Sequence, residues 1–160
     1  MKLENISIST NIMHHGSTVY DFFEEAMRCH VPGLPYADKE GRIVGRMSVR
    51  NVYKSLAVPD YLLRVAGMIG DHADNLEPPE LKIAEFMAAP IEDFLLEEMP
   101  TVSSQSTAVK ALAIMELYNS SYVFLFDEGQ YKGVVTRMNL ARRMLECFKE
   151  HEKKKAAITK

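Results

Sequence analysis

The sequence lacks the features that mark several large classes of protein. Only two of its 160 residues are cysteines, Cys29 and Cys147, and they form no CxxC or CxxH pattern. This disfavours a disulfide scaffold and is typical of a reducing compartment. No apolar run approaches the length of about 20 residues that spans a bilayer, and the N-terminus has no signal-peptide core. We therefore expect a cytoplasmic protein that does not enter the membrane.

A surplus of basic residues is also absent. The net charge is −3 at pH 7 and the sequence pI is about 6.0, which argues against a nucleic-acid-binding protein. The basic run Lys153, Lys154 and Lys155 falls at the end of a predicted helix, where we expect it to face solvent and complement the helix dipole. With 47% hydrophobic and 26% charged residues, the composition is that of a globular protein.

The common catalytic motifs are missing as well. The sequence contains no GxSxG elbow, no P-loop, no GxGxxG and no HExxH. His14 and His15 are neighbours on a predicted strand, so they point to opposite faces and are poor partners for one metal ion. We therefore predict a protein that is not an enzyme, has no metal site and requires no cofactor.

What the sequence does contain is an internal repeat. Residues 45–52 (GRMSVRNV) align with residues 133–140 (GVVTRMNL) at an offset of 88 (133 − 45). The glycine, the small hydroxyl residue, the asparagine and the apolar residue after it coincide. Upstream, Thr18 aligns with Thr107 and Asp38 with Asp127, at an offset of 89 (107 − 18). The one-residue difference falls in a predicted turn, where insertions are tolerated.

Each repeat predicts the same order of elements. Short strands at 12–14 and 101–103 precede helices that begin at Thr18 and Thr107. Hairpins follow, with strands at 31–37 and 42–47 in the first repeat and at 122–126 and 131–135 in the second. A last helix begins near Ser48 or Thr136. We predict an α+β fold of two tandem β-α-β-β-α repeats, with the first repeat in residues 1–58, a helical connector packed on the pair in 59–98, and the second repeat with a C-terminal helix in 99–160.

The repeated motif resembles the CBS-domain family. A helix and a hairpin lead into glycine, two apolar residues, serine or threonine, two further residues and aspartate or asparagine. Residues 45–51 and 133–139 carry this pattern, although Arg46 departs from it, and residues 34–38 (LPYAD) look like the second strand of that family. The resemblance covers about residues 10–56 and 99–147.

The resemblance implies a Bateman module, in which two repeats pack as a pseudo-twofold pair. Two clefts between the repeats then bind adenine nucleotides or related adenosyl compounds, such as AMP, ATP or S-adenosylmethionine. It also implies a homodimer and a regulated partner enzyme, channel or transporter. With no catalytic domain attached, the chain resembles the stand-alone members of the family.

The candidate nucleotide-binding residues follow from the motif. Ser48 and Thr136 begin helices, whose N-termini favour a phosphate, and their side chains serve equally well as plain helix caps. Asn51 and Asn139 lie one turn further on, within reach of ribose hydroxyls. The resemblance places further residues against the ligand, and plain core packing or solvation is the alternative for them. They are Met13, His14, Leu34, Met47 and Arg50 in one cleft, and Thr101, Val102, Val123, Val135 and Arg137 in the other.

Asparagine at both motif positions departs from the family, which most often has aspartate there. An amide loses the stronger charge-assisted hydrogen bond to ribose and removes a negative charge near the phosphates. Two hypotheses therefore stay open. The protein is either an adenine-nucleotide sensor, or an interaction protein that keeps the paired fold with empty clefts.

Overall fold

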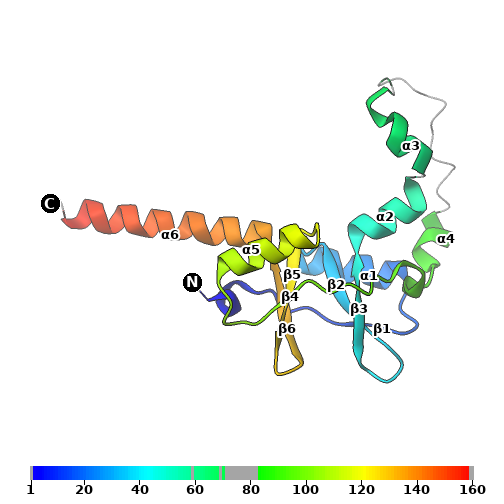
Figure 1. Cartoon of the computed structure of the whole chain (residues 1–160), viewed down its shortest axis with the longest axis horizontal. Helices are drawn as coiled ribbons and strands as arrows, with labels where there is room; N and C mark the ends of the chain where they lie inside the picture. The colour runs from blue at the N-terminus through cyan, green and yellow to red at the C-terminus, as the bar shows by residue number, and fades with distance from the viewer. Residues whose placement is uncertain (1, 59, 69, 71–82, 159–160) are drawn as a thin grey trace. The chain divides into compact units, whose positions relative to one another are not determined.

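The structure is a computed structural model that describes residues 2–58, 60–68, 70 and 83–158. The chain divides into two compact units, and each unit holds one of the two repeats (Figure 1). The first-repeat unit comprises residues 11–97. The second-repeat unit comprises residues 1–10 and 98–160.

The first-repeat unit contains a three-stranded sheet in the order β1-β2-β3. Strand β1 pairs with β2 in parallel, and β2 pairs with β3 in antiparallel fashion. The elements of this unit are β1 (Met13–His14), α1 (Val19–Cys29), β2 (Gly33–Ala37), β3 (Ile43–Ser48), α2 (Val49–Ala57), α3 (Asp60–Val65), η2 (Ala66–Met68), α4 (Ile83–Ala88) and η4 (Ile91–Phe94).

The second-repeat unit has the same topology, with the sheet order β4-β5-β6. Its elements are η1 (Leu3–Ile6), β4 (Thr101–Val102), α5 (Ala108–Leu117), β5 (Tyr122–Asp127), β6 (Gln130–Thr136) and α6 (Arg137–Ile158). The prediction of an α+β fold with two tandem β-α-β-β-α repeats is confirmed. None of the described helices is both long enough and apolar enough to cross a membrane.

The first helix of each repeat begins where the sequence predicts. Thr18 caps α1 in a capping box, in which its hydroxyl accepts from the Asp21 N–H (3.3 Å) and the Asp21 carboxylate accepts from the Thr18 N–H (2.8 Å). Thr107 caps α5 by accepting from the Lys110 N–H at 3.2 Å. These caps account for the aligned threonines.

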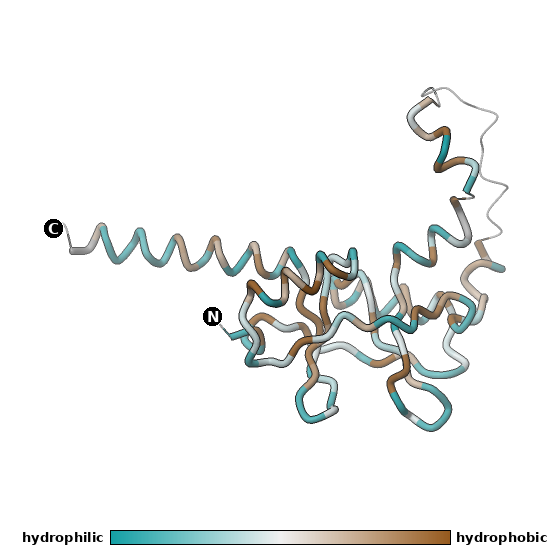
Figure 2. Tube along the Cα trace, viewed as in Figure 1, coloured by the Kyte–Doolittle hydropathy of each residue, from teal (hydrophilic) through white to brown (hydrophobic). Residues whose placement is uncertain are grey.

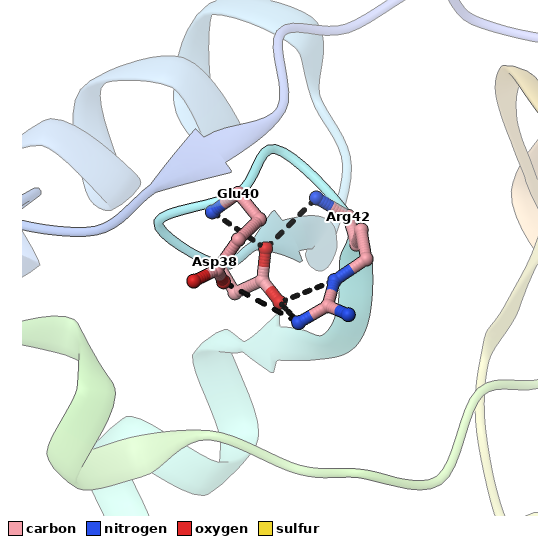
Figure 3. Close-up of polar contacts among 3 residues, drawn as sticks. All are labelled: Asp38, Glu40 and Arg42. Carbon is pink, nitrogen blue, oxygen red and sulfur yellow. Dashed lines mark hydrogen bonds and ion pairs between the residues drawn. The ribbon is translucent and has the colours of Figure 1, made fainter.

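The two hairpin turns explain the change of offset between the repeats. In the first turn, the Asp38 carboxylate accepts backbone N–H groups of Glu40 (3.0 Å) and Arg42 (2.9 Å) and pairs with the Arg42 guanidinium (Figure 3). These contacts, the Arg42 N–H first, hold the pKa of Asp38 below its usual value. The second turn is tighter, because Glu128 and Gly129 both adopt positive φ (50° and 76°).

The segment before each repeat pairs with the other repeat, which the sequence analysis did not predict. Ile8 exchanges backbone hydrogen bonds with Val134 of β6 (2.8 and 2.9 Å), and Leu96 does so with Arg46 of β3 (2.8 and 3.0 Å). Residues 1–10, which the repeat pattern places before the first repeat, belong to the second-repeat unit. The predicted connector 59–98 contains helices, and its residues 59, 69 and 71–82 lie outside the described part.

The two exchanged segments, one around Ile8 and one around Leu96, explain why the motif contains a glycine. A Cβ on Gly45 would lie 2.6 Å from the Leu96 carbonyl oxygen, and one on Gly133 would lie 2.7 Å from that of Ile8. No side chain fits at either position, so glycine recurs because a backbone passes directly over it.

Each unit buries its own apolar side chains beneath its helices. In the second-repeat unit the core joins Leu3 of η1 to the strands and α5, and in the first-repeat unit Ile91 of η4 is fully buried. Figure 2 shows the hydrophobic stretches along the strands of both units and hydrophilic residues at the hairpin tips. The 3-10 helices η1 and η4 therefore anchor the exchanged segments.

Candidate functional site

The two motif hydroxyls stand at helix starts but differ in what they bind. Thr136 caps α6: its hydroxyl accepts from the Asn139 N–H at 3.1 Å and donates to the Asn139 side-chain oxygen. Ser48 occupies the N-cap position of α2 without a side-chain capping bond. Both residues are buried. The cap interpretation therefore holds for Thr136, and ligand contact stays a prediction for both residues.

The two motif asparagines hold the exchanged segments in place. The Asn51 amide donates to the Phe94 carbonyl at 2.9 Å, at the end of η4, and the Asn139 amide donates to the Ile6 carbonyl at 3.4 Å, at the end of η1. A carboxylate has no proton to donate to a carbonyl oxygen at neutral pH. This contact gives a physical reason for asparagine, and not aspartate, at the motif position of both repeats.

Asn51→Asp is therefore expected to destabilise the protein. Loss of the bond to Phe94, with a carboxylate left against a carbonyl, costs about 1–3 kcal/mol, while an acid in the first turn of α2 regains about 0.3–1 kcal/mol. We expect a net loss of about 1 kcal/mol in urea unfolding, from these two terms. Asn51→Ala is the control, since it removes the bond without adding a charge. An aspartate variant as stable as the wild type would contradict this role.

A pocket of about 390 Å³ lies at the start of α6 in the second-repeat unit. It is lined by Asn5, Ile6, Ser7, Asn139, Arg142, Arg143 and Glu146. Arg143 is held at 3.2 Å from Glu146 and 3.5 Å from Glu150, and the Glu146 hydrogen bond raises the pKa of Arg143. Two guanidinium groups beside amide and hydroxyl groups suit an anionic, polar ligand.

A second pocket, of about 370 Å³, lies along α2 in the first-repeat unit. Arg50, Tyr53, Lys54, Val58 and Leu63 line it. Lys54 aligns with Arg142 at the repeat offset of 88 (142 − 54). The pocket therefore carries positive charge at the same repeat position as the first one, with an aromatic and aliphatic wall added.

Tyr53 in this pocket belongs to an aromatic cluster. Its ring centroid lies 5.5 Å from that of Phe23 on α1 and 6.4 Å from that of Phe86 on α4. Centroid distances of this size are favourable for aromatic pairs, so the Tyr53 ring is held in place while about half of the residue stays exposed. It can offer a face to a flat ligand.

The remaining predicted site residues are dispersed. Leu34 and Met47 are fully buried, and Val102, Val123 and Val135 belong to the core of their unit. Met13 is buried beside a third pocket with Asn11, Asp21 and three other α1 side chains, whereas His14 and Thr101 are exposed. Arg137 is held by Glu116 and the Ser120 carbonyl. Contact of these residues with a ligand stays a prediction.

The sequence analysis missed the cations that line the pockets. Arg142, Arg143 and Lys54 lie one helical turn beyond the motif asparagines, so helical spacing was the signal that could have found them. Asn5 and Ser7 carried no such signal, because they join the pocket only through the exchanged segment. Within the described ranges, no three His, Cys, Asp or Glu side chains gather as metal ligands.

A comparison with known protein families identifies the family of the second repeat. Residues 91–146, from η4 to α6, match the CBS domain. This segment is a CBS domain. The match covers η4 and the elements of the second repeat as far as residue 146 of α6. The first repeat shows the same strand order and the same donation from the motif asparagine to a carbonyl of a 3-10 helix. A comparison with curated proteins finds no match.

Solved structures of CBS-domain proteins share the fold. One of unknown function from Kribbella flavida is 20% identical over 90% of this chain and 99% of its own, with a TM-score of 0.59. Another of unknown function, from Thermoplasma acidophilum, is 22% identical over 89% of this chain and 68% of its own (TM-score 0.61). One from Agrobacterium tumefaciens is 11% identical over 90% and 99% (TM-score 0.63). At these identities the likeness establishes the fold alone.

Proposed function

We propose that this protein is a non-catalytic regulatory module that binds an adenine nucleotide or adenosyl compound. CBS-domain proteins are generally regulatory and often bind nucleotides. The observation that carries the proposal is the α6 pocket, where Arg142 and Arg143 lie beside Asn139. Guanidinium groups donate charge-assisted hydrogen bonds to phosphate, which is the anionic group of a nucleotide.

The α2 pocket supports the same class of ligand. Tyr53 offers a ring face, Val58 and Leu63 offer apolar walls, and Arg50 and Lys54 offer positive charge. A flat base joined to a phosphate uses all of these features. Pockets of this size lie at the lower end of the range of about 300–1,000 Å³ that holds small ligands. A ligand that prefers one arrangement of the two repeats would shift their equilibrium and so regulate a partner.

Calorimetric titration with AMP, ATP and S-adenosylmethionine tests the proposal. We expect binding of at least one ligand, and we expect Arg143→Gln or Lys54→Gln to weaken it by about 10-fold or more, because each loses a charge-assisted hydrogen bond. Lys110→Gln, which removes the same charge from exposed α5, is the control. Heat from none of the three ligands overturns the proposal. Unchanged binding by both variants would show that these pockets are not the sites.

A ligand-free interaction protein, regulating an enzyme or transporter, is the second candidate. Asn51 and Asn139, the expected ribose contacts, already donate their amides to Phe94 and Ile6 carbonyls. A thermal-shift screen distinguishes the two, since a ligand specific for the folded state raises the melting temperature by mass action. An unshifted melting temperature with every adenosyl compound favours the interaction protein.

A further inference from the structure

The α2 and α6 pockets lie on equivalent helices of the two repeats and share one cation. Lys54 lines the α2 pocket, and Arg142, its counterpart in the second repeat, lines the α6 pocket. Neither Lys54 nor Arg142 forms an ion pair with another residue in the part of the chain that the structure describes. Each pocket can therefore offer this positive charge to a ligand.

The α2 pocket has apolar walls that the second repeat does not repeat. Tyr53 and Val58 line it, and at the offset of 88 the second repeat has Ala141 and Glu146 in their places (141 − 53 and 146 − 58). The Tyr53 ring is held by its aromatic neighbours and the residue is 49% exposed. A nucleic-acid base stacks on such a ring whether or not it carries a phosphate.

The α6 pocket has polar side chains instead of these walls. Arg143 lines it, where the first repeat has Ser55 at the same offset (143 − 55), and Asn5 and Ser7 join it from the exchanged segment. Among its described lining residues, Ile6 is the only apolar one and none is aromatic. A base finds no ring there on which to stack, whereas guanidinium, amide and hydroxyl groups can all donate hydrogen bonds to a phosphate.

We propose that the two pockets recognise different parts of a nucleotide. The α2 pocket selects the flat base through Tyr53 and accepts an uncharged nucleoside. The α6 pocket selects the phosphate through Arg143 and accepts a sugar phosphate that has no base. This inference rests on the proposed function, because it assigns one chemical group of the nucleotide to each pocket. The two repeats therefore have unequal ligand specificities.

Adenosine, which has no phosphate, and ribose 5-phosphate, which has no base, test the assignment in the full chain. We expect both to bind, with dissociation constants measured by NMR titration. Tyr53→Ala should weaken adenosine binding by about 10-fold or more, the scale of one lost base–aromatic contact, and leave ribose 5-phosphate binding unchanged. Arg143→Gln should weaken ribose 5-phosphate binding by about 10-fold or more, since it loses a charge-assisted hydrogen bond, and leave adenosine binding unchanged.

Three further variants separate ligand contact from a loss of structure. Tyr53→Phe keeps the ring and should bind adenosine like the wild type. Val58→Glu introduces the residue that the second repeat has at this position and leaves the aromatic cluster intact, so it should weaken adenosine binding alone. Tyr61→Ala removes an exposed ring of α3 outside the lining of the α2 pocket and should bind both probes like the wild type.

The outcomes distinguish this assignment from the proposed function. A wild type that binds AMP but fails to bind either probe overturns the assignment alone. So do Tyr53→Ala and Arg143→Gln variants that weaken both probes alike, or a Tyr53→Phe variant that binds adenosine as weakly as Tyr53→Ala. A wild type that binds neither the probes nor AMP, ATP or S-adenosylmethionine overturns both proposals.

Discussion

Gly133→Ala is expected to lower the free energy of unfolding by about 3 kcal/mol, the combined scale of backbone strain and overpacking. Gly133 adopts a φ of +147°, a conformation that residues with a side chain rarely adopt. The new Cβ would also lie 2.7 Å from the Ile8 carbonyl oxygen. Because that atom belongs to a backbone bonded to β6, it can move only if the exchanged segment separates from the strand. Urea unfolding at constant m-value measures the loss.

Two matched glycines separate the causes of this loss. Gly129 has a φ of +76° but nothing within 4 Å of its Cβ position, so Gly129→Ala should cost only about 1 kcal/mol of strain. Gly45 has no positive φ, but a Cβ placed on it would lie 2.6 Å from the Leu96 carbonyl oxygen. The loss of stability in Gly45→Ala therefore measures the steric clash alone. If Gly133→Ala cost no more than Gly129→Ala, residues 1–10 would not lie over β6.

Glu25→Gln is expected to destabilise the first-repeat unit by about 2 kcal/mol at neutral pH, the scale of lost charge-assisted hydrogen bonds in a buried site. Glu25 on α1 is buried, and its carboxylate accepts from the Arg28 guanidinium (2.7 and 2.8 Å) and the Asn11 N–H (2.6 Å). The Arg28 hydrogen bond, the Asn11 N–H and the Cys29 thiol outweigh burial and lower the pKa of Glu25 from 4.5 to about 2.

The same residue predicts how stability depends on pH. Because the folded pKa is lowered, the contribution of Glu25 is complete above pH 4.5 and is lost as the pH falls towards about 2. The wild type should therefore lose stability over this interval more steeply than Glu25→Gln does. Glu24→Gln makes the same charge change at an exposed neighbour and should keep the wild-type slope. Equal slopes for all three proteins would show that Glu25 does not hold this network in solution.

Local patterns were sufficient to predict the elements of both repeats. The caps at Thr18 and Thr107, the hairpin turns at Asp38 and Asp127, and the helix after Thr136 all depend on residues a few positions apart. Such contacts form within one element or one turn, so their residue types recur at readable spacings. The comparison of the chain with itself then identified the tandem repeat.

The site was predictable only in part, because its residues come from distant segments. Asn139 and the helix start at Thr136 follow from the motif, and the cations at Arg142 and Arg143 follow from helical spacing. The bond from Asn139 to Ile6 joins positions 133 residues apart, and nothing in the local pattern of either one signals it. The apolar motif residues were ambiguous for the same reason, since a core and a ligand surface require the same side chains.

The sequence by itself determined that this chain repeats one β-α-β-β-α unit, because each element is specified by neighbours along the chain. Only the tertiary structure decided which segment accompanies which repeat. Residues 1–10 cross to the second repeat, and the segment around Leu96 returns to the first, each held by a backbone pair with one strand residue. A single backbone pair uses groups that every residue has, so it leaves no periodicity in the sequence. The sequence feature that accompanies this backbone pair is a glycine, Gly45 in the first repeat and Gly133 in the second. Its role becomes clear only from the structure, because the passing backbone leaves no room for a side chain there.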